Sequence, residues 1–361
     1  MDIDRLLEQM VKHGASDLHM QEQFKPALRI DGTLRRLDME PSSNEDMKTA
    51  LKKILTDKQH ARFMDMNEGD GSYQVEGLGR FRVNAYRALD LSNLAIRYIP
   101  FEVPKVETLN LPEKIPELAL SKRGLILVTG VTGSGKSTTL AAMLRHINEN
   151  MRMKIITLED PVEFLHAEEL CVISQREVGI DTADYHMGLR QVFRQNPDVI
   201  LLGEIRDAAV MSEALAGAET GHMVFSTLHT ADARHTISRV LSFYPPHDHQ
   251  AVRELISGVL VATISMRLLP KKEGGRIPAV ELMVNTALIS DIIAEEGRLY
   301  ELPQLIHDGH LQYGMQTFDQ CILKQYRDGL IDYEVARVNS SNPSEFDLAI
   351  QGITGGGAES K

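Results

Sequence analysis

The 361-residue sequence contains little cysteine, no long hydrophobic run and no excess of positive charge. Its two cysteines, Cys171 and Cys321, lie 150 positions apart, so the chain can build neither a disulfide framework nor a cysteine-based zinc site. No stretch reaches the roughly 18 apolar residues that a membrane span requires, and the acidic amino terminus does not resemble a signal peptide. We therefore expect a cytoplasmic protein, whose association with any membrane would depend on its partners.

The chain carries 39 basic and 51 acidic residues, which give a net charge of −12. Proteins that bind nucleic acid through a broad surface spread lysine and arginine over one face, so this balance argues against such binding. It leaves room for a local anion site. Hydrophobic residues make up 43% and charged residues 25%, as in soluble globular proteins, and the length suggests about two domains.

Residues 1–99 have the pattern of an α+β domain. Apolar residues at helical spacing predict a helix over 3–11, with Asp2 as its N-cap, and a second helix near Ser43. The dipeptide Asp31-Gly32 is typical of a tight hairpin turn. Strict alternation follows over 80–85, where every second side chain is apolar. These patterns predict a small antiparallel sheet with helices packed on one face.

Four prolines between residues 100 and 118 favour a linker over a regular element, and we place the domain boundary there. Short apolar runs then follow, each separated from the next by enough chain for a helix, as in a doubly wound parallel sheet. The runs are 125–128, 155–158, 199–202 and 223–225. Residues 119–350 are thus expected to form one α/β domain, helical after about Ser238, and residues 351–361 a disordered tail.

The segment Gly130-Val-Thr-Gly-Ser-Gly-Lys-Ser137 matches the pattern GxxxxGK[ST] and lies between an apolar run and a helical one. Glycines let backbone N–H groups close around phosphate oxygens at a helix N-terminus, the lysine reaches the β- and γ-phosphates, and the serine hydroxyl binds Mg²⁺. ATP and Mg²⁺ are therefore the expected ligands. The expected phosphate-binding residues are Gly130, Thr132, Gly133, Ser134, Gly135, Lys136, Ser137 and Thr138.

Acidic residues follow two of the predicted strands, at the sheet edge where open α/β sheets bind ligands. Glu204 comes after the third run, where many P-loop enzymes have an aspartate one position earlier, at Gly203. It is a candidate for holding Mg²⁺ through water or polarising the attacking water; the alternative is that it caps a neighbouring helix. Glu159 and Glu163 follow the second run and are both candidates for the base.

Two histidines, His222 and His229, flank the last predicted strand. A neutral imidazole both donates and accepts hydrogen bonds, so the pair could sense the γ-phosphate or link it to a neighbouring subunit. The alternative is a pair of structural histidines at the strand ends.

Taken together, the motifs resemble those of the secretion-type ATPases of type II secretion and type IV pilus machines. The matching segments are the loop ending in Lys136-Ser137-Thr138, LEDPVE at 158–163, LGEIRD at 202–207, TLHT at 227–230, ASDLH at 15–19 and RIDG at 29–32. The tetracysteine insertion and extra N-terminal domain of the extension and secretion members are not expected here. The chain is therefore most similar to the compact PilT type, the pilus-retraction or twitching-motility ATPases.

This resemblance implies a RecA-like P-loop domain, a smaller PAS-like N-terminal domain, C-terminal helices and a hexameric ring. It implies Glu163 as the base, Glu204 as the Walker B acid, and His222 and His229 as a histidine box. In the ring, arginines of the N-terminal sheet, for which Arg82 and Arg97 are our candidates, would complete the ATP site of the next subunit. The implied partner is a PilC-type platform protein of the inner membrane, at whose cytoplasmic face the motor would work.

One motif of the retraction ATPases is missing. They carry Ala-Ile-Arg-Asn-Leu-Ile-Arg-Glu in the C-terminal domain, whereas residues 287–295 read ALISDIIAE and lack both arginines. That helix is linked to retraction rather than hydrolysis, so the direction of the motor stays open. The alternatives are a PilU-like accessory paralogue and a nucleotide-dependent regulatory ring of low turnover; a nucleic-acid translocase is disfavoured by the net charge.

Overall fold

The computed structural model describes residues 1–30, 32–99 and 103–350. The chain divides into two compact units, Met1–Glu102 and Val103–Lys361, each described here by itself. Among the described residues, no helix has both the length and the apolar character that crossing a bilayer demands.

The first unit is a six-stranded antiparallel sheet in the order β3-β2-β1-β6-β5-β4, with three helices. Its strands are β1 (Asp17–Gln21), β2 (Ala27–Ile30), β3 (Thr33–Arg36), β4 (Glu68–Val75), β5 (Gly79–Ala88) and β6 (Leu91–Ile99). Its helices are α1 (Ile3–Lys12), α2 (Asn44–Ile54) and α3 (Asp57–Met66). Side chains from all three helices and from one face of the sheet form a single hydrophobic core, so the opposite face of the sheet is left polar.

The elements predicted in this unit are confirmed. Asp2 accepts a hydrogen bond from the backbone N–H of Asp4 at the start of α1, and Ser43 forms a capping box at the start of α2. Along β5, the alternating apolar side chains at 81, 83 and 85 are buried, as expected. Ile30 lies opposite Thr33 in the β2–β3 pair, but Asp31 of the expected turn lies outside the described residues.

The second unit is a seven-stranded sheet in the order β13-β12-β7-β11-β10-β8-β9, parallel except for the antiparallel edge strand β13. The strands are β7 (Gly124–Thr129), β8 (Lys154–Glu159), β9 (Val172–Glu177), β10 (Val199–Leu202), β11 (Met223–Leu228), β12 (Leu260–Pro270) and β13 (Arg276–Val284). The four apolar runs predicted to be parallel strands lie in β7, β8, β10 and β11, which confirms that prediction.

Helices cover both faces of this sheet, which makes it doubly wound. Strand residues of one face pack with α4 (Ile115–Ala119) and α5 (Lys136–Asn150). Those of the other face pack with α6 (Tyr185–Val192), α7 (Ala208–Glu219), α8 (Ala233–Ser242) and α9 (His249–Val259). Short 3-10 turns are η1 (Val106–Thr108), η2 (Phe193–Gln195), η3 (Pro246–Asp248) and η4 (Leu299–Glu301). Because both faces are buried, the strands are continuously apolar instead of alternating.

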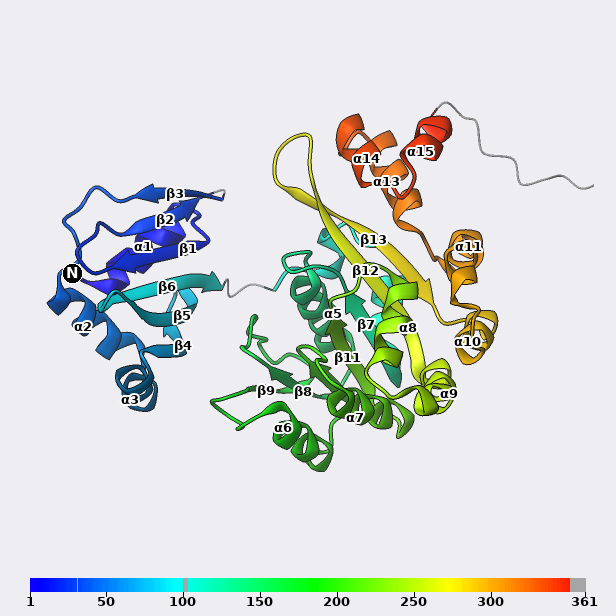
Figure 1. The fold of residues 1–361 in the computed structure, drawn as a ribbon, viewed down its shortest axis with the longest axis horizontal. Helices are drawn as coiled ribbons and strands as arrows, with labels where there is room; N and C mark the ends of the chain where they lie inside the picture. The colour runs from blue at the N-terminus through cyan, green and yellow to red at the C-terminus, as the bar shows by residue number, and fades with distance from the viewer. Residues whose placement is uncertain (31, 100–102, 351–361) are drawn as a thin grey trace, which may run out of the picture. The chain divides into compact units, whose positions relative to one another are not determined.

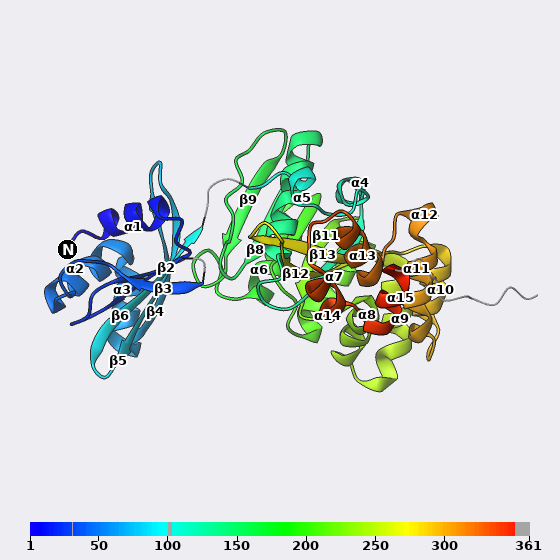
Figure 2. The same ribbon diagram turned by 90° about the horizontal axis from the view of Figure 1, so that it is seen from above.

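The remaining helices continue the second unit toward the C-terminus. They are α10 (Ala287–Ala294), α11 (Leu302–Asp308), α12 (His310–Tyr313), α13 (Phe318–Arg327), α14 (Tyr333–Asn339) and α15 (Pro343–Ile350). Helices α9, α10 and α11 follow one another in space (Figure 2). The last three helices, α13–α15, pack around the far part of the long β12–β13 hairpin, where they form a separate hydrophobic cluster (Figure 1).

Two expectations for this unit need correction. The chain after Ser238 is not wholly helical, because β12 and β13 form a hairpin that extends the parallel sheet. The stretch expected to be a linker contains η1 and α4, whose residues Val106, Ile115 and Leu118 are buried against the sheet. Proline does not prevent this, since Pro116 lies in the first turn of α4, where the missing N–H costs nothing. Residues 100–102 and 351–361 lie outside the described residues.

Candidate functional site

The glycine-rich loop joins the end of β7 to the start of α5, as expected from its sequence. Gly130, Gly133 and Gly135 have φ angles of +143°, +78° and +97°, which side chains rarely adopt. A β-carbon at Gly130 would also collide with the main-chain oxygen of Met266. The N-cap of α5 is Gly135, and no side chain among the described residues caps it. No side-chain cap therefore occupies the first backbone N–H groups of this 15-residue helix in the described part of the chain. N–H groups at a helix N-terminus suit the binding of an anion.

Lys136 folds back onto this loop. Its Nζ atom donates hydrogen bonds to the carbonyl oxygens of Gly130, at 2.8 Å, and Val131, at 3.0 Å. Burial lowers the pKa of Lys136, and the nearby carboxylates of Glu204 and Glu163 partly oppose that shift. The ammonium group is therefore partly desolvated and close to two acids, so an incoming phosphate would meet a cation that little water screens.

The loop also contains a buried polar atom without a partner. Ser134 is 2% exposed, and its Oγ atom has no hydrogen-bond partner among the described residues. Ser137 and Thr138, in the first turn of α5, are only partly buried. An unpaired buried hydroxyl is costly, and a ligand oxygen would satisfy it. The loop therefore fits a nucleotide phosphate on its own geometry.

Glu204 lies just beyond β10, where an arginine and a histidine side chain contact its two carboxylate oxygens. One carboxylate oxygen forms a close ion pair with Arg206, and the other lies 3.2 Å from Nε2 of His229. Arg206 also lies 3.6 Å from Asp160. Burial lowers the pKa of Arg206, but the hydrogen bond to Glu204 and the negative charges of Glu204 and Asp160 together outweigh burial, so the net shift of the pKa is upward. The structure thus joins the Walker B candidate Glu204 to His229, which follows the neighbouring strand β11.

The two acids that follow β8 have different surroundings. Glu159 is 9% exposed, and burial raises its pKa to about 7. Its Oε2 atom accepts a hydrogen bond from the backbone N–H of Glu163, and Glu177 similarly accepts one from Val162. Glu163 itself is exposed and close enough to Lys136 to affect its pKa. Glu159 therefore holds the loop that presents Glu163 and is itself turned into the protein.

His222 is not brought to this edge of the sheet. It precedes the first residue of β11, whereas His229 follows the last, and six residues of strand span about 20 Å. Its Nδ1 atom lies within hydrogen-bond distance of Gly217 O and Thr220 Oγ1, and its ring meets Phe193 edge to face. Within this chain His222 therefore does not lie beside the glycine-rich loop, and its contacts at the far end of the strand fit the structural alternative.

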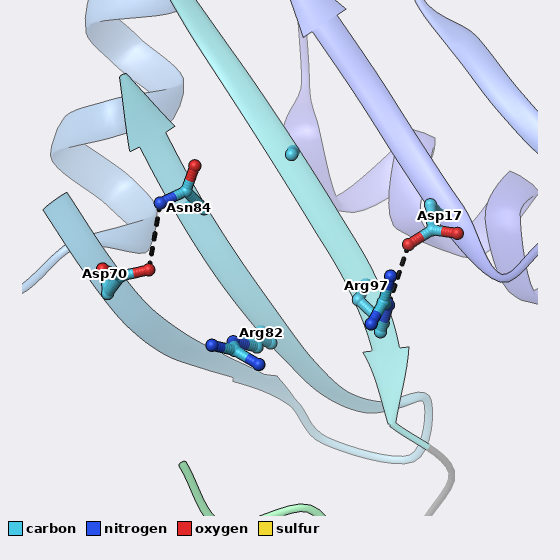
Figure 3. A pocket seen from close by; sticks show the side chains of 6 residues that line it. Asp17, Asp70, Arg82, Asn84 and Arg97 are labelled. Atoms are coloured by element: carbon cyan, nitrogen blue, oxygen red, sulfur yellow. Dashed lines mark hydrogen bonds and ion pairs between the residues drawn. The ribbon is translucent and has the colours of Figure 1, made fainter. Parts of the chain in front are cut away.

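Arg82 and Arg97 lie opposite each other on β5 and β6, on the polar face of the first unit's sheet. With Asp17, Asp70, Asn84 and Ala95 they line an open cavity of about 200 Å³ (Figure 3).

Within this cavity, Arg97 donates a hydrogen bond of 2.9 Å to Asp17, whose side chain is only 12% exposed. Burial raises the pKa of Asp17, but hydrogen bonds from Ser16 and Arg97 and the positive charge of Arg97 together outweigh burial, so the net shift of the pKa is downward. Arg82 is exposed. Of the two candidate arginines, Arg82 is thus the one less engaged within its own unit.

Sequence reasoning missed two residues beside Glu204. Arg206 was part of the LGEIRD segment but received no role, although it pairs with the acid two positions before it. Tyr185, the first residue of α6, brings its hydroxyl next to Gly203. A β-carbon added to Gly203 would lie 2.8 Å from the hydroxyl oxygen of Tyr185. No local pattern indicates this contact, since 18 residues separate the two positions.

The chain is similar to known proteins over nearly its whole length. The family described as "type II/IV secretion system protein" matches residues 1–305. The type IV pilus retraction ATPase PilT of Pseudomonas aeruginosa is 41% identical over 346 residues, which cover 96% of this chain and 100% of that protein. The type IV pilus ATPase PilU of the same organism is 37% identical over 97% of this chain and 92% of its own length. A crystal structure of the pilus retraction motor PilT with bound ADP matches with a TM-score of 0.88 at 39% identity, covering 96% of this chain and 98% of that one.

Proposed function

Because the chain belongs to the family of type II/IV secretion system proteins, and is an ATPase of the PilT type within it, we propose that it hydrolyses ATP to drive type IV pilus retraction. The observation that carries the proposal is the sheet edge of the second unit. There the glycine-rich loop, Lys136, Glu163 and the Glu204–His229 pair lie together, from four strand ends that are distant in sequence.

In the proposed site, each group has a task that its surroundings support. The N–H groups of the loop and the Ser134 hydroxyl bind phosphate oxygens, and Lys136 exchanges its bonds to Gly130 and Val131 for the β- and γ-phosphates. Ser137 and Glu204 hold Mg²⁺, the latter through water. Bound MgATP supplies the phosphoanhydride bond and the cation that neutralises charge on it. Glu163, exposed and anchored through its backbone by Glu159, orients the attacking water as the base.

His229 contributes through Glu204. Its Nε2 atom faces one carboxylate oxygen, so it fixes the direction in which the other oxygen points. Because an imidazole both donates and accepts, the same side chain can follow the loss of the γ-phosphate after hydrolysis. A change at the nucleotide would thereby reach β11.

We further propose a homohexameric ring in which Arg82 and Arg97 of one subunit complete the ATP site of the next. The resemblance to retraction ATPases supports this, as does the polar face that carries both arginines. The ring would act on a platform protein of the inner membrane from its cytoplasmic side. Sedimentation with and without nucleotide tests the assembly, and a monomer in both conditions would contradict it.

Two measurements test the function itself. Lys136→Ala is expected to abolish phosphate release and Glu204→Ala to reduce it strongly, both with the circular dichroism spectrum unchanged; normal turnover in either variant refutes these roles. Deletion in the source organism should give many pili without twitching.

The missing arginines of the 287–295 segment and the 37% identity to PilU favour one second candidate, an accessory ATPase that assists a paralogue. In that case, deletion would leave retraction intact under low load.

A further inference from the structure

The hydroxyl group of Tyr185 is buried at the acid edge of the sheet, and no residue in the described part of the chain is its hydrogen-bond partner. Its Oη atom is inaccessible to solvent and makes no hydrogen bond to any described residue. Burial raises the pKa of Tyr185, and Asp160, Glu204 and Glu159, in that order, raise it further. The hydroxyl therefore stays protonated and is a donor within electrostatic reach of three carboxylates, none of which accepts a hydrogen bond from it in this structure.

Two glycines bring the hydroxyl there. At Gly188 in α6 a β-carbon would lie 2.8 Å from Leu158, so this glycine lets the helix lie directly on β8. At Gly203 a β-carbon would lie 2.8 Å from Tyr185 Oη, so a side chain at this position would compete with the hydroxyl for the same space. Gly203 is also where many P-loop enzymes have their strand-end acid. The hydroxyl occupies that space here, and the acid lies one residue further on, at Glu204.

We propose that Tyr185 is a positioning residue of the ATPase site, whose hydroxyl donates a hydrogen bond to Glu204 when the carboxylate turns away from Arg206. This rests on the proposed function. In the structure both oxygens of Glu204 are taken, one by Arg206 and one by His229. An acid that serves a metal-bound water must give up the Arg206 pair, and an oriented donor nearby compensates for that loss. An unpaired buried hydroxyl is costly, and the turned carboxylate of Glu204 would give this one an acceptor.

The kinetic test compares Tyr185→Phe with the unaltered protein. A hydrogen bond to a charged group formed only during turnover predicts a fall in kcat of roughly tenfold, with the KM for ATP within about twofold. The matched control is Tyr244→Phe, which removes a hydroxyl of the same core that is paired with Ser212. Its kcat should be unchanged. Normal kcat in Tyr185→Phe, or an equal loss in both variants, overturns the proposal.

A second test needs neither ATP nor turnover. Thermal unfolding of the nucleotide-free protein is measured for Gly203→Ala, for Tyr185→Phe and for the double variant. Gly203→Ala alone should lower the midpoint by about 3 °C or more, because the new methyl meets the hydroxyl. In the Tyr185→Phe background the same change should be neutral or stabilising, since the position has no unusual φ. Additive losses would refute the placement of the hydroxyl.

The two proposals fail in different ways. Absence of ATP hydrolysis by the unaltered protein refutes the proposed function, whatever the unfolding data show. Hydrolysis by the unaltered protein together with normal turnover by Tyr185→Phe refutes only the role of Tyr185.

Discussion

Glu159 makes the stability of the second unit depend on pH in a way that one substitution should remove. Burial raises its pKa from 4.5 to about 7, so the native state holds the proton more tightly than the unfolded chain does. The free energy of unfolding must therefore fall as pH rises from about 4.5 to about 7. Above that range the folded protein carries the full free-energy cost of ionising the buried carboxyl group of Glu159. The shift corresponds to a cost of about 3 kcal/mol, as an upper value.

Glu159→Gln keeps an oxygen that can accept the N–H of Glu163 and removes the charge. We expect the variant to match the unaltered protein near pH 4.5 and to be more stable by up to about 3 kcal/mol at pH 8. Urea unfolding followed by circular dichroism at several pH values measures the difference. Glu281, whose pKa burial also raises to about 7, is present in both proteins and cancels.

The control is Glu219→Gln, which removes an exposed carboxylate from the end of α7. It should change stability by only a few tenths of a kcal/mol at every pH. A difference between Glu159→Gln and the unaltered protein that stays constant from pH 4.5 to 8 would refute the reasoning, because it would mean that burial does not control the protonation of Glu159.

Further predictions concern the loop, the histidines and the N-terminal unit. His229→Ala should lower kcat at least about tenfold, whereas His222→Ala should leave kcat near normal and lower the free energy of unfolding by about 1 kcal/mol. Phosphate release measures the first effect and urea unfolding the second. Equal losses of kcat in the two variants would contradict the separation of the two histidines along β11. Gly130→Ala should abolish nucleotide binding in equilibrium dialysis, because a methyl there collides with β12; tight binding would contradict this. Arg97→Ala should destabilise the first unit by about 1 kcal/mol through the loss of its bond to Asp17, and an unchanged unfolding curve would show that this pair contributes nothing.

The parallel strands and the phosphate loop could be predicted because their signals are local. A strand buried on both faces is a short apolar run, and the glycine-rich loop is defined by eight consecutive residues. β12 was missed because Thr263 and Ser265 interrupt its apolar run. Both are fully buried, and the hydroxyl of Ser265 accepts a hydrogen bond from Thr129 at the end of β7. The pairing of β12 with β7 thus explains the polar residue at 265, whereas the hydroxyl of Thr263 has no hydrogen-bond partner among the described residues.

The separation of His222 from His229 had a signal in the sequence. Seven positions separate the two histidines, and the apolar run predicted to be a strand, residues 223–225, lies between them; in the structure the strand fills all six intervening positions. An extended segment of that length places its ends about 20 Å apart, so the two side chains could not share one phosphate. The role of Tyr185 had no such signal, because it depends on how closely α6 approaches β8.

Glu159 and Glu204 each lie at or just beyond the C-terminal end of a parallel strand, and their sequence positions alone do not distinguish their roles. The structure does, through the groups that surround them. Burial raises the pKa of Glu159, so it tends to hold a proton, and its side chain accepts the backbone N–H of Glu163 and thereby fixes that loop. Glu204 forms an ion pair with Arg206 through one carboxylate oxygen, and its other oxygen lies 3.2 Å from Nε2 of His229. A carboxylate that lies beside an arginine and is partly open to solvent, as Glu204 is, can serve a metal ion. A buried carboxyl group that tends to hold its proton, as Glu159 does, is poorly suited to that task, so the division of roles follows from burial and neighbouring charge.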